Sequence, residues 1–387
     1  MIKLIRLSRF TRAACIAALA AVTAMAASAQ KRMVIADQDA SGPGGSDMMS
    51  LLVLLQAPNV NVLGLTVVTG DGWRDAEVAH AQRLLEFIGR TDIKVYPGAA
   101  FPLWRTQEWT KQAEAIYGKA TYKGAWSDNR KGAWDDVSNL REGMPTTKPA
   151  DEDAAHFMVR MVRQYPHQVT IYAAGPMTNV ALAISLDPHF AELAQELVIM
   201  GGSVNPITDA KEWVNAPRHE FNLWFDPEAS SIVLKAHWAK ISVTTIDASI
   251  KTHVTPEFIE ALKKSDSPAA KYIVRFTRPG GAGTAAYLWD ELAAATWIDP
   301  SITTKERYQY MDVSTEHGPN YGDVLLYEDN DKPALTLQRA HLQLDVDVQK
   351  LNKMMVDLMS APTPGSHNPA PLPPPDAAPA PIQGVSK

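Results

Sequence analysis

The sequence predicts an α/β fold, an open, mostly parallel (mixed) Rossmann-like sheet with helices on both faces. Short apolar runs typical of buried strands alternate with segments of helical apolar spacing along most of the chain. Two of these runs end in polar loops with glycine, at residues 37–47 and 69–72. Of the 387 residues, 46% are hydrophobic, and no linker-like break interrupts residues 30–359. One large domain is therefore expected.

The expected elements are justified in order by their apolar pattern. Continuous apolar runs predict buried parallel strands, and spacings of three and four predict the helices between them. A proline in the first turn supports the helix that begins near residue 226. Strands are expected at 33–36, 60–68, 93–95, 168–173, 196–200 and 240–246. Helices are expected from 47, at 76–88 and 151–164, from 180 and 226, and at 287–296 and 348–359, with antiparallel strands within 308–348.

Residues 101–136 differ in character from the rest of the chain. Four tryptophans are interleaved with tyrosines, lysines and glycines without a clean period. We interpret this stretch as a long loop, and long loops are often functional. Its rings could stack on a planar ligand or could simply pack the loop onto the body of the domain.

The two ends of the chain read as processing and tail segments. Residues 1–29 have a basic n-region, an apolar h-region and a small-residue cleavage site, which predicts a signal peptide with a mature start near Gln30. The apolar run is short for a transmembrane helix, so no stable membrane anchor is expected after cleavage. Residues 361–387 are rich in proline and alanine and predict a disordered tail. Residues 30–360 then form the domain, in the periplasm or outside the cell.

The cysteine content excludes a disulfide in the mature protein, and the net charge indicates the class of ligand. The single cysteine, Cys15, lies inside the signal peptide, so the mature protein has no disulfide. Removal of the signal's four basic residues takes the formal net charge from −6, by four charges, to −10. An acidic protein is a poor nucleic-acid binder by bulk electrostatics, which favours a small-molecule substrate.

The loop after the first strand carries the chemistry. Asp37 and Asp39 come at the strand end, and Asp47 opens the next helix after a glycine-rich turn. Carboxylates at the carboxyl edge of a parallel sheet lie where such sheets bind ligands, and oxygen ligands without Cys or His suit Ca²⁺ or Mg²⁺. Ser46 or Asp47 could instead be a helix N-cap. A phosphate-binding loop fits poorly because no Gly-Lys-Ser/Thr follows, and the glycine-rich insert argues against an aspartyl-phosphate enzyme.

Five motifs in order over residues 33–359 together resemble the nucleoside hydrolase family, whose members prefer inosine and uridine. The first is the acidic loop, which matches the family's Asp-x-Asp-Pro-Gly-x-Asp-Asp pattern with Ser46 in place of one acid. The second is residues 66–71, with Asp71 for the usual Asn. The third is the turn at 174–179. The fourth is the segment from Met200 through Asn215 to residues 220–229, and the fifth is Trp289-Asp290, where the family often has His-Asp.

The resemblance implies a site and a reaction. It implies that one Ca²⁺ is held by Asp39, Asp47, the carbonyl of Ala174 and Asp290, with Asp39 also the base that takes a proton from water. Asp37 would support this shell from behind. The resemblance further implies a substrate-binding set of Ser46, Asp71, Met200, Asn215, Glu220, Asn222 and Trp289. Cleavage of an N-ribosidic bond passes through an oxocarbenium-like state, which nearby carboxylates stabilise.

Three departures from the family pattern concern the sugar and the leaving group. Ser46 in place of an acid removes one charge and a strong acceptor for a ribose hydroxyl, and Asp71 adds a charge nearby. Trp289 removes an obvious proton donor to the leaving base. Residues 122–126 occupy about the region of the family's His-Gly loop. The identity of the base, and whether the leaving group is a nucleobase at all, therefore stays open at this point.

The leading hypothesis is an exported, calcium-dependent hydrolase that cleaves ribonucleosides or related ribosides to ribose and free base for salvage. Two alternatives stand beside it. A non-catalytic ribose- or nucleoside-binding protein on the same fold is favoured by Ser46 and Trp289, and a hydrolase of another glycoside by the Trp-rich stretch. The acids at 39, 47 and 290 favour the enzyme, because a binder need not keep a costly charged cluster. The resemblance also implies a homodimer or homotetramer.

Overall fold

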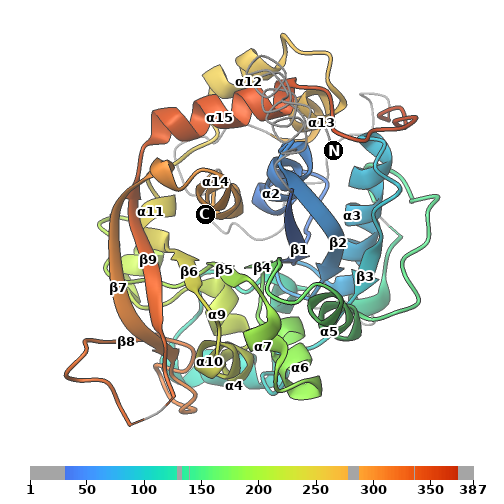
Figure 1. Cartoon of the computed structure of the whole chain (residues 1–387). Coiled ribbons are helices and arrows are strands. Elements are labelled where there is room, and N and C mark those ends of the chain that lie inside the picture. Colours follow the sequence, from blue (N-terminus) through green and yellow to red (C-terminus); the bar gives the residue numbers. More distant parts are fainter. Residues whose placement is uncertain (1–30, 129–132, 139, 278–286, 335, 374–387) are drawn as a thin grey trace, which may run out of the picture.

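The computed structural model describes residues 31–128, 133–138, 140–277, 287–334 and 336–373, so the predicted signal peptide and residues 374–387 lie outside the described residues. A nine-stranded sheet of order β3-β2-β1-β4-β5-β6-β9-β7-β8 forms the centre (Figure 1). The first seven strands in this order, from β3 through β1 to β9, pair in parallel, and β7 is antiparallel to its two neighbours β9 and β8. The predicted mixed, mostly parallel sheet is confirmed. The strands are β1 (Arg32–Gln38), β2 (Val60–Val67), β3 (Val95–Pro97), β4 (Val169–Ala174), β5 (Glu196–Met200), β6 (Ile241–Thr244), β7 (Thr303–Val313), β8 (Val324–Tyr327) and β9 (Arg339–Val346).

Helices cover both faces of the sheet (Figure 1). Alternate residues of β4 show the two sides, because Tyr172 packs in one core and Ile171 and Ala173 pack in the other. The first face carries α2 (Ser46–Gln56), α3 (Arg74–Phe87), α12 (Pro256–Leu262), α13 (Pro268–Phe276), α14 (Asp290–Ile298) and α15 (Val348–Ser360). The second carries α5 (Ala154–Gln164), α6 (Thr178–Leu186), α7 (Phe190–Leu193) and α10 (Pro227–Lys235). Shorter elements are α4 (Gln107–Tyr117), α8 (Lys211–Asn215), α9 (Phe221–Phe225), α11 (Ile246–Ser249), η1 (Gly124–Ser127), η2 (Ala133–Asp135) and η3 (Pro300–Ile302).

Three strands differ by two residues or more from the prediction, and one of them is β6, which occupies 241–244 where 240–246 was expected. β1 continues through Asp37 to Gln38, so this acid lies within the strand and not after it. A buried aspartate is tolerated there because Thr66 and Asn179 donate hydrogen bonds to Asp37 Oδ1, at 2.6 and 2.8 Å. β3 occupies residues 95–97 where 93–95 were expected. β5 has the predicted bounds.

The interpretation of residues 101–136 as a loop is wrong over residues 107–117, which form α4. Thr106 caps this helix, since its side-chain oxygen accepts a hydrogen bond from the Trp109 N–H at 3.1 Å. Within α4 only Thr110 is buried. Trp109, Ala113 and Ile116 of α4 do recur at helical spacing, but they are exposed or half-buried and lie in an aromatic-rich stretch without a clean period, which hides the helix in the sequence.

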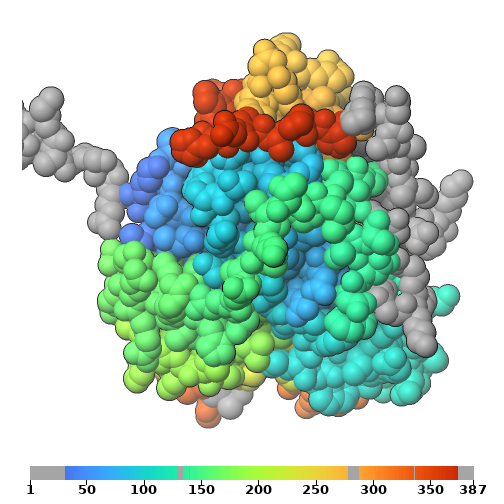
Figure 2. Space-filling view, turned by 90° about the vertical axis from the view of Figure 1, so that its right-hand side faces the viewer, coloured from blue at the N-terminus to red at the C-terminus, as the bar shows by residue number. Residues whose placement is uncertain are grey.

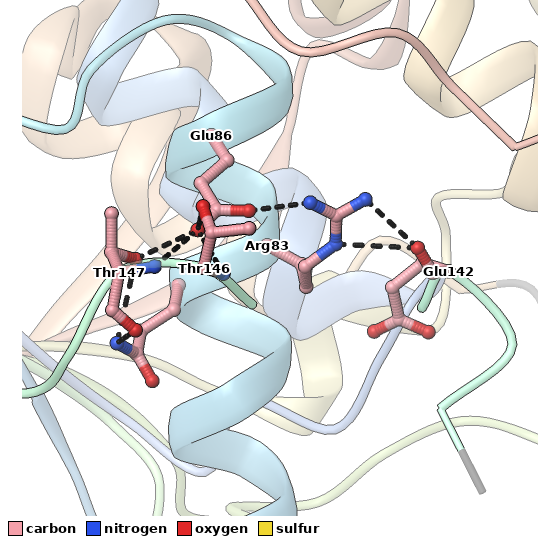
Figure 3. Close-up of polar contacts among 6 residues, drawn as sticks. Arg83, Glu86, Glu142, Thr146 and Thr147 are labelled. Carbon is pink, nitrogen blue, oxygen red and sulfur yellow. Dashed lines mark hydrogen bonds and ion pairs between the residues drawn. The ribbon is translucent and has the colours of Figure 1, made fainter. Parts of the chain in front are cut away.

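The segment that follows is fixed to α3 by polar contacts (Figure 3). Arg83 donates two hydrogen bonds to the carbonyl oxygen of Glu142, at 3.2 and 3.0 Å, and pairs with Glu86. Glu86 Oε1 accepts from the backbone N–H groups of Thr146 and Thr147, both at 2.7 Å. These contacts hold residues 142–147 against the outer surface of α3 although they belong to no helix or strand.

The antiparallel strands predicted within residues 308–348 are confirmed, because β7 pairs antiparallel with both β8 and β9, with Met311 opposite Leu326 in the first pair. β9 also inserts between β6 and β7 and runs parallel to β6, with Ile241 opposite Ala340. The sheet therefore continues its parallel part with a strand taken from the end of the chain.

The sequence predicted a disordered tail from residue 361. Residues 361–373 are instead ordered and lie against the C-terminal end of α3. Figure 2 shows this segment, in red, crossing the surface beside α3. Ser366 Oγ donates to the Ile88 carbonyl at 2.7 Å, the His367 N–H to Gly89 at 2.7 Å, and the Ala370 N–H to Glu86 at 2.8 Å. Proline-rich sequence forms no helix or strand, but here its backbone satisfies the carbonyls that α3 leaves free. No described helix is long and apolar enough to cross a membrane.

Truncation after Ser360 should lower the free energy of unfolding by about 2 kcal/mol or more, since three hydrogen bonds to the end of α3 are lost with their packing. Truncation after Pro373 is the matched control and should leave stability unchanged. Urea denaturation of both proteins measures the difference. Equal stability of the two truncated proteins would contradict a structural role for residues 361–373.

Candidate functional site

The candidate site lies where the strand order reverses. From β1 the chain moves to β2 and β3 on one side, and from β4 it proceeds to β5 and β6 on the other. The carboxyl ends of β1 and β4 therefore diverge into loops on opposite sides and leave a crevice, the usual ligand site of open α/β sheets. Asp39 follows β1 directly, and Ala174 is the last residue of β4, paired in register with Gln38.

Asp39 is 2% exposed and is held by backbone on two sides. Its Oδ2 accepts a hydrogen bond from the Asp71 N–H at 2.9 Å, which connects the loops after β1 and β2. Two glycines make the close approach possible. A Cβ at Gly70 would lie 2.1 Å from Asp39 Oδ2, and one at Gly175 would lie 2.8 Å from the Asp39 nitrogen. Only glycine fits at these positions while Asp39 keeps its place.

Asp47 and Asp290 meet at the first turns of two helices, α2 and α14. Asp47 Oδ2 accepts from the Ser41 N–H at 2.9 Å, and Asp290 Oδ2 accepts from Gln38 Nε2 at 3.1 Å. The two carboxyl groups also interact with each other, which adds to the effect of burial in raising the pKa of Asp47. Both helix N-termini favour negative charge, which partly offsets the repulsion.

Two more acids complete the cluster. The side chain of Asp71 forms a hydrogen bond with Tyr122, from the segment between α4 and η1. Glu77, on α3, is buried and accepts from the Gly72 N–H at 2.6 Å through Oε1, while its Oε2 has no hydrogen-bond partner. We define the carboxylate cluster as Asp39, Asp47, Asp71, Glu77 and Asp290.

The electrostatics of the carboxylate cluster favour a bound cation or retained protons. Burial raises the pKa of Asp290 to about 7 and that of Asp71 to about 6. Burial, followed by repulsion from neighbouring acids, raises the pKa of Asp39 and Asp47 well above the usual range. No lysine or arginine of the described chain forms an ion pair with any of the five acids.

The donor chemistry fits a hard cation, because every side-chain ligand on offer is a carboxylate oxygen. The positions of these side chains, however, do not yet form a finished metal site. Within the described ranges, no three His, Cys, Asp or Glu side chains converge as a finished metal site. Asp47 and Asp290 instead contact each other, so a cation held by both would replace this contact.

The predicted substrate residues fall into two groups. Glu220 and Asn222 are buried beside the end of β5, where Asn222 Nδ2 donates to the Met200 carbonyl at 3.1 Å. Glu220 caps α9, because its carboxylate accepts from the N–H groups of Asn222 and Leu223 at 2.9 and 3.0 Å. Asn215 is instead exposed at the end of α8. Trp289 packs on Trp213 and Tyr287, with ring centroids 5.7 and 4.7 Å away.

The geometry agrees with what comparisons with known proteins show. The family model described as inosine-uridine preferring nucleoside hydrolase matches residues 34–353. The chain belongs to this family. The family that the sequence resemblance predicted is thereby confirmed.

Individual relatives support the assignment. Probable uridine nucleosidase 1 of Oryza sativa subsp. japonica is 32% identical over 240 residues, 62% of this chain and 66% of that protein. Pyrimidine-specific ribonucleoside hydrolase RihA of Shewanella sp. (strain MR-7) is 25% identical over 343 residues, 86% of this chain and 98% of the relative. A solved plant nucleoside hydrolase superposes with a TM-score of 0.67 at 25% identity, over 86% of this chain and 99% of its own. This nucleoside hydrolase is a hydrolase acting on N-glycosyl compounds, and the predicted enzyme class is confirmed.

Sequence reasoning missed several residues of the site in this nucleoside hydrolase. Glu77 gave no signal, because a glutamate in the first turn of a helix is common. Tyr122 was seen only as one of many aromatic residues in the Trp-rich stretch. Gln38 accepts from the Asp39 N–H at 3.1 Å and donates to Asp290, but in the sequence it is only the residue between two acids after the predicted strand. Their roles depend on contacts between distant segments.

Gly70→Ala should lower kcat/KM by about 100-fold, because the new methyl group displaces the Asp39 carboxylate, and misplacement by about 1 Å costs this much. Gly318→Ala is the matched control, since a Cβ there meets nothing within 4 Å. Steady-state kinetics measure the effect, with circular dichroism to verify folding. Full activity in folded Gly70→Ala would contradict the placement of Asp39 at the reaction centre.

His219, beside the Glu220 cap, should make stability depend on pH. Burial, followed by the charge of Arg105, lowers the pKa of His219 to about 4 from an ordinary value near 6.5. The unfolded chain therefore binds a proton that the folded chain rejects, and stability falls by about 3 kcal/mol as pH falls from 6.5 to 4. His219→Gln should remove this part of the slope in urea denaturation. Parallel curves for the two proteins between these pH values would contradict it.

Proposed function

We propose that this nucleoside hydrolase is an exported, calcium-dependent enzyme that cleaves ribonucleosides to ribose and free base. The observation that carries the proposal is the carboxylate cluster at the reversal point of the sheet, in which four acids are buried and Asp71 is half-buried. Such a concentration of negative charge opposes folding unless it serves a ligand or a reaction. An electron-poor sugar carbon and a hard cation are the partners that suit it best.

Asp39, Asp47, Asp290 and the Ala174 carbonyl would hold the metal, since all four lie at the carboxyl edge around β1 and β4. When bound, Ca²⁺ would supply positive charge that lowers the pKa of a water molecule and orients the sugar hydroxyls. Burial, followed by repulsion from neighbouring acids, raises the pKa of Asp39 and Asp47, and the ion would relieve the repulsion. Calcium is proposed because flexible, all-oxygen sites suit it.

The chain's own residues would then divide the work. Asp39 would take the proton of the attacking water. Two hydrogen bonds hold it in place, one from the Asp71 N–H to its carboxylate and one from its own N–H to the side chain of Gln38. Asn222 and Glu220 would bind sugar hydroxyls from the end of β5. The negative cluster would stabilise the positive charge that develops on the ribose ring as the bond to the base breaks.

Uridine is the first substrate to test. The Oryza relative is named a probable uridine nucleosidase and the Shewanella relative a pyrimidine-specific hydrolase. The predicted signal peptide is what supports export, and salvage of bases from nucleosides outside the cytoplasm would follow from it.

The test is release of reducing sugar from a panel of uridine, cytidine, inosine and adenosine by residues 30–387. We expect ribose release that a chelator abolishes and added Ca²⁺ restores. Asp39→Asn should lower kcat by about 1000-fold, the contribution of a positioned general base. Asp357→Asn, at an exposed position on α15, is the matched control and should keep full activity. Absence of release from every nucleoside, or release that is indifferent to the chelator, would contradict the proposal.

A further inference from the structure

Ser46 lies at the junction of two segments of the site that are far apart in the sequence. Its Oγ accepts a hydrogen bond from the Asp290 N–H at 2.9 Å and donates one to Glu291 Oε2. Ser46 opens α2 and the two acids open α14. One hydroxyl thereby joins the first turns of both helices, directly beside Asp47.

Glu291 is a buried acid that the proposed reaction has not used. It is 0% exposed, and its second oxygen, Oε1, has no hydrogen-bond partner. Within the described chain no lysine or arginine pairs with it. A buried carboxylate with a free oxygen is costly and requires an explanation. The explanation that its contacts offer is Ser46.

We propose that Glu291 and Ser46 act as one unit that supplies the sugar contact for which the sequence resemblance expects an acid at position 46. This inference rests on the proposed function. The carboxylate is contributed from α14, and the Ser46 hydroxyl carries its effect to the substrate. Glu291 is thus a positioning residue, and Ser46 is the residue that touches the sugar.

The hydrogen-bond inventory of Ser46 supports this assignment. A hydroxyl has one hydrogen and two lone pairs. The hydrogen is committed to Glu291 and one lone pair to the Asp290 N–H, so one lone pair remains to accept from a sugar hydroxyl. A hydroxyl that donates to a carboxylate becomes a stronger acceptor in turn, because hydrogen bonds in a chain polarise one another. Ser46 is half-buried and Glu291 fully buried, so only Ser46 is within reach of a ligand.

The test compares Ser46→Ala, Glu291→Gln and the double variant on uridine, 2′-deoxyuridine and 3′-deoxyuridine. Each single variant should raise KM for uridine by about 10-fold with little change in kcat, the value of one hydrogen bond to a charged group. The loss should vanish for whichever deoxynucleoside lacks the bonded hydroxyl. The double variant should be no worse than Ser46→Ala, because the residues act as a unit.

A charge relocation sharpens the test. Ser46→Asp alone places two carboxylates together and should lower kcat/KM at least as much as Ser46→Ala. In the double variant Ser46→Asp with Glu291→Gln, the loop residue is the only acid of the pair. Affinity for uridine should then recover. Glu196→Gln is the matched control for stability, because it removes a buried acid at the amino end of β5, away from the site. It should not alter discrimination between the sugars.

The outcomes separate the two proposals. Ribose release by the unaltered enzyme, with equal losses for all three substrates in the variants, would overturn the inference and leave the function intact. No release by the unaltered enzyme would overturn the function. Calorimetric binding of ribose then decides the inference, since affinity should fall about 10-fold in Glu291→Gln relative to the unaltered protein, and unchanged affinity would overturn it.

Discussion

Repulsion among buried carboxylates is the constraint on which this structure depends. Five acids share one edge of the sheet, and burial and mutual repulsion raise the pKa of Asp39 and Asp47. The fold offsets part of this cost without a lysine or arginine of the described residues, by directing the N-termini of α2 and α14 and backbone N–H groups at the acids. The glycines at 70 and 175 then permit the packing that brings the loops together. The strand order matters because it opens the crevice at this point.

Polar groups at the edge of the site come from segments that the family motifs do not cover. The loop after β1 has Ser46 where an acid was expected, and Glu291 of α14 stands behind that serine. Asp71 stands where an amide was expected, and Tyr122 stabilises its charged form. In both cases a change in the motif is met by a residue from another element. The charge balance of the site is therefore a property of contacts between elements and cannot be assigned to any single motif.

The sequence predicts much of the fold and half of the site, for a physical reason. Buried strands such as β2 and β5 are legible because their apolar runs are continuous, and loops at strand ends are legible because they follow. α4 was missed because its short apolar period, at Trp109, Ala113 and Ile116, lies in an aromatic-rich stretch without a clean period. Residues 361–373 were missed because two of their three hydrogen bonds to the end of α3 come from backbone N–H groups, which leave no trace in composition. Glu77, Glu291 and Tyr122 were missed since their importance lies in neighbours more than 30 residues away, at Asp39, Ser46 and Asp71.

The position of β9 has a consequence for how the molecule is assembled. β6 pairs with β9, nearly one hundred residues later in the chain, and β7 can join the sheet only through β9. Until residues 339–346 have been synthesised, β6 is an exposed edge strand with unpaired backbone groups. The pairing of β6 with β9 joins residues far apart in the sequence, so completion of this part of the sheet is a late and slow folding event. A nascent chain that stops short of β9 presents an open parallel edge, where association with other chains competes with folding.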